Sequence, residues 1–114
     1  MEECPFCRIV KGDLPSQKVY EGERVVAFRD IRPQAPVHVL VIPRRHVGSL
    51  LELGDADGDL AGELLLTAVR VARQEGVDRD GFRLVVNTGW RSGQTVGHLH
   101  IHVLGGRIFR WPPG

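Results

Sequence analysis

The sequence has almost no net charge, because 15 lysine and arginine residues offset 14 acidic ones to leave +1. A protein that binds duplex DNA or an anionic membrane mainly through electrostatics needs a basic excess, so the balance argues against both partners. No apolar run approaches the ~20 residues that cross a bilayer. The start, Met1-Glu2-Glu3-Cys4, is acidic and lacks the apolar stretch of a signal peptide. We therefore expect a cytoplasmic protein whose two cysteines do not form a structural disulfide.

Repeats, low-complexity tracts and a linker between domains are also missing from the sequence. A length of 114 residues is that of one domain, and we expect a single domain over residues 1–114. The composition, 42% hydrophobic and 25% charged, is normal for a soluble globular protein.

The chain does contain a stretch in which three histidines alternate with branched apolar residues, His98-Leu99-His100-Ile101-His102-Val103-Leu104. A period of two predicts a strand with the apolar side chains on the core face and the imidazoles on the other. One alternative is a structural accident, and another is a three-histidine metal site. Since His98 and His102 would lie roughly 13 Å apart along a straight strand, three of them would bind one ion poorly. The spacing therefore favours different roles for the three histidines.

The rest of the pattern predicts an α+β fold with a mostly antiparallel sheet, one long helix and a short N-terminal helix. We expect a short helix or turn over residues 4–12, strands over 18–20, 24–28, 37–42 and 82–86, a long helix over about 58–75, and loops over 30–36 and 87–96. Apolar residues at three- and four-residue spacing mark the long helix. Asp55 or Asp57 can cap its start and Gly76 can end it.

The histidine stretch resembles the signature of the histidine-triad (HIT) nucleotide hydrolases and transferases, and most closely their nucleotide-binding branch. Further segments carry the resemblance over nearly the whole chain: Asp30-Ile31-Arg32-Pro33-Gln34-Ala35-Pro36-Val37-His38, Val41-Ile42-Pro43-Arg44-Arg45-His46, Gly93-Gln94-Thr95, Leu104-Gly105-Gly106-Arg107 and Trp111-Pro112-Pro113-Gly114. The tail favours this branch over the dinucleoside polyphosphate hydrolases. The resemblance implies a five-stranded antiparallel sheet, usually in a homodimer.

The resemblance also assigns the catalytic histidines. His100, the middle one, would attack the α-phosphorus of a nucleotide ester or amide and carry the nucleotidyl group, which water then removes. We expect a backbone carbonyl to fix the tautomer of His100. His102 would donate a proton to a phosphate oxygen or the leaving group, and His38 matches a fourth histidine beside the triad.

Nucleotide-binding positions are implied by the same resemblance. They are Asp30, Ile31, Asn87, Gly93, Gln94, Thr95, His100, His102 and Trp111. Asp30 can accept hydrogen bonds from both ribose hydroxyls, and Ile31 can lie against the base. The backbone at Gly93 can approach a phosphate closely. Two positions depart from the family: Thr95 replaces a more common serine, and Gly97 replaces an aromatic residue.

Cys4 and Cys7 have zinc-knuckle spacing, but one such pair supplies only two ligands. A redox pair is the alternative, although no strand precedes it as in thioredoxin-like motifs. In some relatives of the HIT family, two N-terminal cysteines and two histidines hold zinc, and the matching histidines here are His46 and His98. Four protein ligands make such a zinc structural. We expect no organic cofactor.

The predicted function is hydrolysis of purine nucleoside 5'-phosphoramidates or related α-phosphate-linked nucleotides. One alternative is a dinucleoside polyphosphate hydrolase, and another is a nucleotide- or partner-binding module with vestigial catalysis. A zinc-stabilised nucleic-acid binder is disfavoured because the charge is balanced and no aromatic-basic stripe is present.

Overall fold

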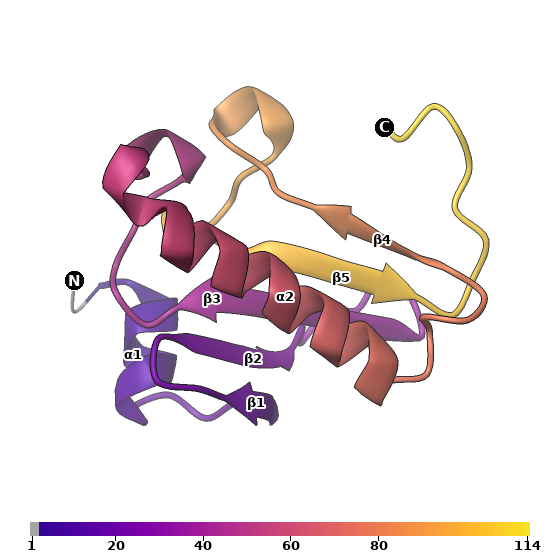
Figure 1. Cartoon of the computed structure of the whole chain (residues 1–114), viewed down its shortest axis with the longest axis horizontal. Coiled ribbons are helices and arrows are strands. Elements are labelled where there is room, and N and C mark those ends of the chain that lie inside the picture. The colour runs from indigo at the N-terminus through magenta and orange to yellow at the C-terminus, as the bar shows by residue number, and fades with distance from the viewer. Residues whose placement is uncertain (1–2) are drawn as a thin grey trace.

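The computed structural model describes residues 3–114, so Met1 and Glu2 of the acidic start lie outside the described residues. The elements are α1 (Pro5–Lys11), β1 (Lys18–Glu21), β2 (Val25–Arg29), β3 (Val37–Pro43), α2 (Gly58–Gln74), β4 (Phe82–Val85) and β5 (Ile101–Gly105), with short 3-10 turns at Leu50–Glu52, Asp55–Asp57 and Trp90–Ser92. The strands form one sheet in the order β1-β2-β3-β5-β4 (Figure 1), and each neighbouring pair is antiparallel. The expected α+β fold is therefore confirmed.

The two helices pack on opposite faces of the sheet. Alternate residues of β2 belong to different apolar clusters: Val25 and Ala27 pack with buried residues of α2, whereas Val26 and Phe28 pack with α1. Because successive strand residues point to opposite faces, α1 and α2 cover different sides. Figure 1 shows α2 running along the sheet and α1 at one end of it. None of the helices within residues 3–114 is long and apolar enough to cross a membrane.

The histidine stretch alternates as expected, but only its second half is a strand. Leu99 joins the cluster under α2, while His100 packs on the α1 side against Phe6. The strand begins at Ile101 rather than His98, since the ladder with β3 ends at the Val41–Ile101 pair. If the ladder continued, Pro43 would be the next β3 residue to bond to β5, opposite Leu99. A proline has no N–H to donate to that strand. The Leu99 N–H bonds instead to the carbonyl of Val47, at 2.6 Å.

The start of α2 differs from the predicted cap. Asp55–Asp57 forms a separate 3-10 turn, and Asp57 occupies the cap position without a side-chain cap hydrogen bond. Its carboxylate accepts instead from the Gly54 N–H and from Arg45, and these bonds hold the pKa of Asp57 below its usual value. The helix ends where expected, because Gly76 adopts the left-handed conformation with φ of +75°.

Candidate functional site

Five histidines from three segments lie in a row on the α1 side of the sheet. The ring centroids are 5.0 Å apart for His46 and His98, 4.9 Å for His100 and His102, and 5.1 Å for His38 and His102. The pairing of β3 with β5 brings His38 beside His102. The fold therefore collects the catalytic and metal-binding histidines predicted from the sequence into one region.

The ring of His100 is oriented by the backbone beside it. Its Nδ1 lies 2.7 Å from the carbonyl oxygen of His98, and this side chain is only 5% exposed. A carbonyl can only accept, so Nδ1 carries the proton and Nε2 keeps its lone pair. The expectation of a backbone carbonyl acceptor is thus confirmed.

His38 and His102 form a directed pair. The backbone N–H of Gln34 donates to Nδ1 of His38 at 3.0 Å, which leaves the proton of a neutral His38 on Nε2. Nε2 then donates to Nδ1 of His102 at 2.8 Å, so neutral His102 carries its own proton on Nε2. Burial, together with the nearby imidazoles of His100 and His38, lowers the pKa of His102 to about 4. His102 is therefore a neutral donor at pH 7.

Asp30, His38 and His102 lie close enough to hold a metal ion, but the hydrogen bonds argue against it. A neutral histidine that binds metal through Nε2 must carry its proton on Nδ1. In His38 that proton would face the N–H of Gln34. The Asp30 carboxylate lies 3.4 Å from Nε2 of His38, and it opposes the lowering of the His38 pKa by burial. We therefore interpret this group as a proton network.

Cys4, Cys7, His46 and His98 form a second cluster whose ligand atoms all lie within 4.8 Å of one another. Sulfur-to-nitrogen distances are 3.3 Å for Cys4–His98, 3.2 Å for Cys7–His46 and 3.6 Å for Cys7–His98. Zinc–ligand bonds of about 2.0–2.3 Å in a tetrahedron give edges near 3.6 Å, so the spacing fits zinc.

The tautomer of His98 also fits a metal. Nε2 of His98 donates to the carbonyl of Pro43 at 2.9 Å, which leaves the lone pair on Nδ1 facing the two sulfurs. This side chain is fully buried, and burial lowers its pKa so that it stays neutral. Burial likewise raises the pKa of the Cys7 thiol. The four donor atoms, and the hydrogen bond from His98 to the Pro43 carbonyl, are those of a closed zinc site.

A pocket of about 420 Å³ opens beside His100 and His102. Its apolar walls come from α1, from the sheet and from two loops, and include Phe6, Ile9, Leu14, Phe28, Leu40 and Val96. The same pocket is also lined by polar groups, among them the two histidines, Asp30 and Thr95. A mostly apolar pocket that also presents a few polar groups suits a flat base joined to a sugar and a phosphate.

Five of the predicted nucleotide-binding residues line this pocket together: Asp30, Ile31, Thr95, His100 and His102. Ile31 is 89% exposed at its mouth, while Trp111 lies in the exposed tail. Asn87 and Gly93 belong to the segment that leads to the triad, outside the residues that line the pocket.

The side chain of Gln94 stabilises the loop that precedes the triad through hydrogen bonds to backbone groups. Its Nε2 donates to the carbonyls of Gly48 at 2.8 Å and Val96 at 3.0 Å, and its Oε1 accepts from the N–H of Gly89. This side chain is therefore engaged with backbone groups, a role that the sequence analysis did not predict. Phe6 was also missed, although its position between the two cysteines places it beside the metal cluster.

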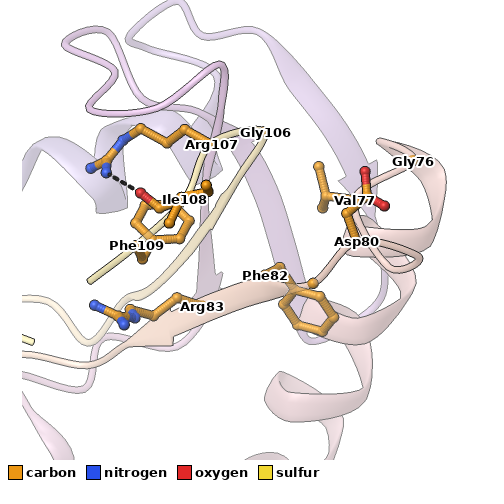
Figure 2. Close-up of a pocket in the computed structure, with 10 residues that line it drawn as sticks. Gly76, Val77, Asp80, Phe82, Arg83, Gly106, Arg107, Ile108 and Phe109 are labelled. Atoms are coloured by element: carbon orange, nitrogen blue, oxygen red, sulfur yellow. Dashed lines mark hydrogen bonds between the residues drawn. The ribbon is translucent and has the colours of Figure 1, made fainter. Parts of the chain in front are cut away.

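A second groove, of about 640 Å³, lies between the end of α2, β4 and the segment after β5 (Figure 2). Phe109 sits between two guanidinium groups there, 5.3 Å from Arg83 and 4.3 Å from Arg107. No histidine lines this groove. The histidines that the sequence predicts to be catalytic therefore line the smaller pocket and not this groove.

Comparison with known proteins agrees with this geometry. A HIT domain model matches residues 11–108. A 14 kDa zinc-binding protein of Brassica juncea is 48% identical over 111 residues, which cover 96% of this chain and 97% of that protein. A HIT family hydrolase structure from Legionella pneumophila matches with a TM-score of 0.96 and 45% identity, covering 98% and 100% of the two chains. A histidine triad nucleotide-binding protein from Candida albicans matches with a TM-score of 0.83 and 30% identity, covering 98% and 85%. The chain therefore belongs to the HIT domain family, as its histidine stretch predicts.

Proposed function

We propose that the protein hydrolyses purine nucleoside 5'-phosphoramidates, or related nucleotides linked through the α-phosphate, by way of a nucleotidyl group on His100. The observation that carries this proposal is the hydrogen bond from Nδ1 of His100 to the carbonyl of His98, at 2.7 Å. It fixes the lone pair on Nε2 and stabilises the positive charge that develops on the ring during attack.

In the first step, Nε2 of His100 attacks the α-phosphorus while the bond from phosphorus to the leaving group breaks. The leaving amine takes the proton from Nε2 of His102, and the His38 Nε2–H that faces Nδ1 of His102 orients this donor. The negative charge left on His102 is balanced by the positive charge that the new bond to phosphorus places on the His100 ring, whose centroid lies 4.9 Å away. In the second step, water attacks the phosphorus, the bond to His100 breaks, and the proton of the water returns to His102. Two displacements thus replace one difficult hydrolysis.

The nucleoside would occupy the apolar pocket. Asp30 accepts from the ribose hydroxyls through the carboxylate oxygen that is not bonded to the N–H of Arg32. Ile31 lies against the base, and the Thr95 hydroxyl, which lines the same pocket as His100 and His102, donates to the phosphate. The nucleotide-binding roles proposed for Asn87, Gly93 and Gln94 would place the phosphate beside the loop before the triad. The N–H groups of Gly93 and Gln94 already donate to the carbonyls of Trp90 and Gly89.

The two alternative functions, a dinucleoside polyphosphate hydrolase and a binding module with vestigial catalysis, would give different results in assays. A dinucleoside polyphosphate hydrolase would cleave diadenosine polyphosphates faster than an adenosine phosphoramidate, and a binding module would bind AMP without turning over either substrate. Assays of the purified protein with both substrates, side by side, separate the three.

His100→Asn is the decisive variant, because the asparagine amide can still donate to the carbonyl of His98 but cannot attack phosphorus. We expect turnover to fall by several orders of magnitude while AMP binding is retained. Quenching the wild-type reaction should trap one adenylyl group, mapped to His100. Near-normal turnover by the variant would refute the mechanism.

We further propose that Cys4, Cys7, His46 and His98 hold one structural zinc ion, in a protein that resides in the reducing cytoplasm. The support is the fit of the donor atoms and the Pro43 carbonyl that fixes His98. Zinc bound there would join α1 to the sheet and leave no open coordination position. Elemental analysis should find about one zinc per chain.

The partners we propose are a purine nucleotide and a second copy of the chain. β4 is an edge strand of the sheet, and the segment that follows β5 exposes Ile108 and Trp111 at 87% and 82%. An edge strand beside exposed apolar side chains can be covered by a partner. Light scattering should report a dimer, and deleting residues 110–114 should alter substrate selectivity more than folding. A monomer across micromolar concentrations would contradict this.

A further inference from the structure

Helix α1 carries side chains for two different sites. Cys4 and Cys7 contribute to the metal cluster, whereas Phe6 and Ile9 form one wall of the nucleoside pocket. Since α1 has only seven residues, these side chains move with one short rigid segment. Any change that displaces α1 must therefore affect both sites.

Phe6 is the direct link between the cluster and the catalytic histidine. Phe6 lies between the two cysteines in the sequence. Its ring contacts three other rings edge to face, with centroid distances of 5.2 Å to His100, 5.3 Å to Phe28 and 5.8 Å to His98. It is 7% exposed. The position of this ring thus limits the space beside His100 in the pocket that both residues line.

Few polar contacts hold α1 in place. Within residues 3–114, its backbone hydrogen bonds beyond the helix itself run only to its own cap and the turn that follows, at Gly12, Asp13 and Leu14. The side-chain polar contacts between α1 and the rest of the described chain are those of Cys4 and Cys7 with His46 and His98. Apart from apolar packing, the two sulfurs attach α1 to the sheet.

We propose that Cys4 and Cys7 are a redox modification site that controls nucleotide binding. A peroxide would convert the two thiols to a disulfide, separate α1 from His46 and His98, and displace the Phe6 wall of the pocket. The nucleotide half of this inference rests on the function proposed above. The disulfide and the release of α1 do not depend on that function.

The geometry of the pair supports this chemistry. Cys4 precedes the first residue of α1, and the N–H of Cys7 donates to its sulfur at 3.3 Å. The two sulfurs lie within 4.8 Å, and a spacing of three residues at a helix start is that of redox C-x-x-C pairs. Cys4 is partly exposed while Cys7 is buried, so the oxidant reaches Cys4 first.

The reaction balances with one hydrogen peroxide. The Cys4 sulfur attacks one peroxide oxygen and the O–O bond breaks, giving a sulfenic acid and hydroxide. The Cys7 sulfur then attacks the Cys4 sulfur, the S–S bond forms and the hydroxyl group leaves. The two thiols lose two electrons and two protons, the peroxide becomes two waters, and any zinc held by the thiolates is released as the free ion with two protons taken from solvent.

The test uses the full chain, purified reduced with zinc and then treated with one equivalent of hydrogen peroxide. Peptide mapping should find a Cys4–Cys7 disulfide, and a chromogenic chelator should detect one zinc per disulfide. Amide exchange in residues 5–11 should accelerate. Titration calorimetry should show the dissociation constant for AMP rising about tenfold, the change expected when one aromatic contact is lost. A dithiol reductant with added zinc should restore the affinity.

Two variants separate disulfide formation from the effect of the Phe6 ring on AMP binding. Cys7→Ser retains the exposed Cys4 but cannot form the disulfide, so peroxide should not produce the reversible loss of AMP affinity. Phe6→Leu should weaken AMP binding in the reduced protein without lowering the zinc content, because it alters the wall and keeps all four ligands. Equal AMP affinity in Phe6→Leu and wild type would refute the role of Phe6.

Three results would overturn the proposal or part of it. If peroxide produces sulfinic acid or links two chains instead of joining Cys4 to Cys7, the modification site is wrong. If the disulfide forms and AMP affinity stays within twofold, the coupling to the pocket is wrong. If the reduced protein does not bind AMP, the proposed function is wrong, while the disulfide, zinc release and exchange of α1 still decide the redox site.

Discussion

Burial of His102 should make the protein lose stability as the pH falls below neutral. The pKa of this imidazole drops from 6.5 to about 4 in the folded protein, because burial and the neighbouring rings of His100 and His38 disfavour its charged form. Between those two values the unfolded chain binds a proton that the folded chain does not. Stability must therefore decrease as the pH falls through this window, and the contribution is complete below about pH 4.

The expected size follows from the two pKa values. At pH 5 nearly all of the unfolded imidazole is protonated and about a tenth of the folded one is, which gives about 2 kcal/mol of lost stability relative to pH 7. Burial lowers the pKa of His38 and of His98 as well, so the whole protein should lose more than this. A variant that changes His102 alone is needed to isolate its share.

His102→Asn is that variant, since its side-chain oxygen can accept from Nε2 of His38 as Nδ1 of His102 does. Urea unfolding at pH 7, 6 and 5, with zinc, ionic strength and chain concentration held constant, gives the free energy of unfolding for both proteins. The wild type should lose about 2 kcal/mol more than the variant between pH 7 and pH 5. An equal loss in both proteins would refute the assignment of a depressed pKa to His102.

Two further substitutions test the packing around the site. Gly105→Ala would place its Cβ 2.7 Å from the side chain of Val77 and should cost about 1–3 kcal/mol in urea unfolding, whereas Gly97→Ala meets open space and serves as the matched control. Gln94→Ala removes three hydrogen bonds of the loop before the triad, so amide exchange in residues 87–96 should accelerate and KM for the substrate should rise more than kcat changes. Unchanged exchange in that loop would show that Gln94 does not hold it.

The arrangement of the triad could be predicted because alternation is a local property of the backbone. Leu99, Ile101 and Val103 all enter the core beneath α2, as a period of two requires. The two cysteines and His46 meet His98 as the family resemblance implies, although 91 residues separate Cys7 from His98. Alternation gives the face on which each side chain lies, and the resemblance gives its partner across the fold.

Features that depend on a distant residue could not be predicted in this way. The strand begins at Ile101 because Pro43 on the neighbouring strand has no N–H, and nothing in the histidine stretch itself records this. The amide of Gln94 was assigned to phosphate binding by its motif, but backbone groups as far away as Gly48 engage it. In the sequence Phe6 cannot be distinguished from any other core aromatic residue. Its role becomes visible only in the fold, where α1 places its ring against His100.

The different roles of the three histidines follow from what lies opposite each one. Nδ1 of His98 faces the sulfurs because Nε2 has the Pro43 carbonyl as its acceptor. In His100, two residues later, the Nδ1–H donates to the carbonyl of His98, so the nitrogen with the free lone pair is Nε2 instead of Nδ1. His102 is again set by a neighbour, because the His38 Nε2–H occupies its Nδ1. If His98 is held by zinc, its backbone is fixed together with its ring, and the metal would orient the ring of His100, the proposed nucleophile, through that carbonyl.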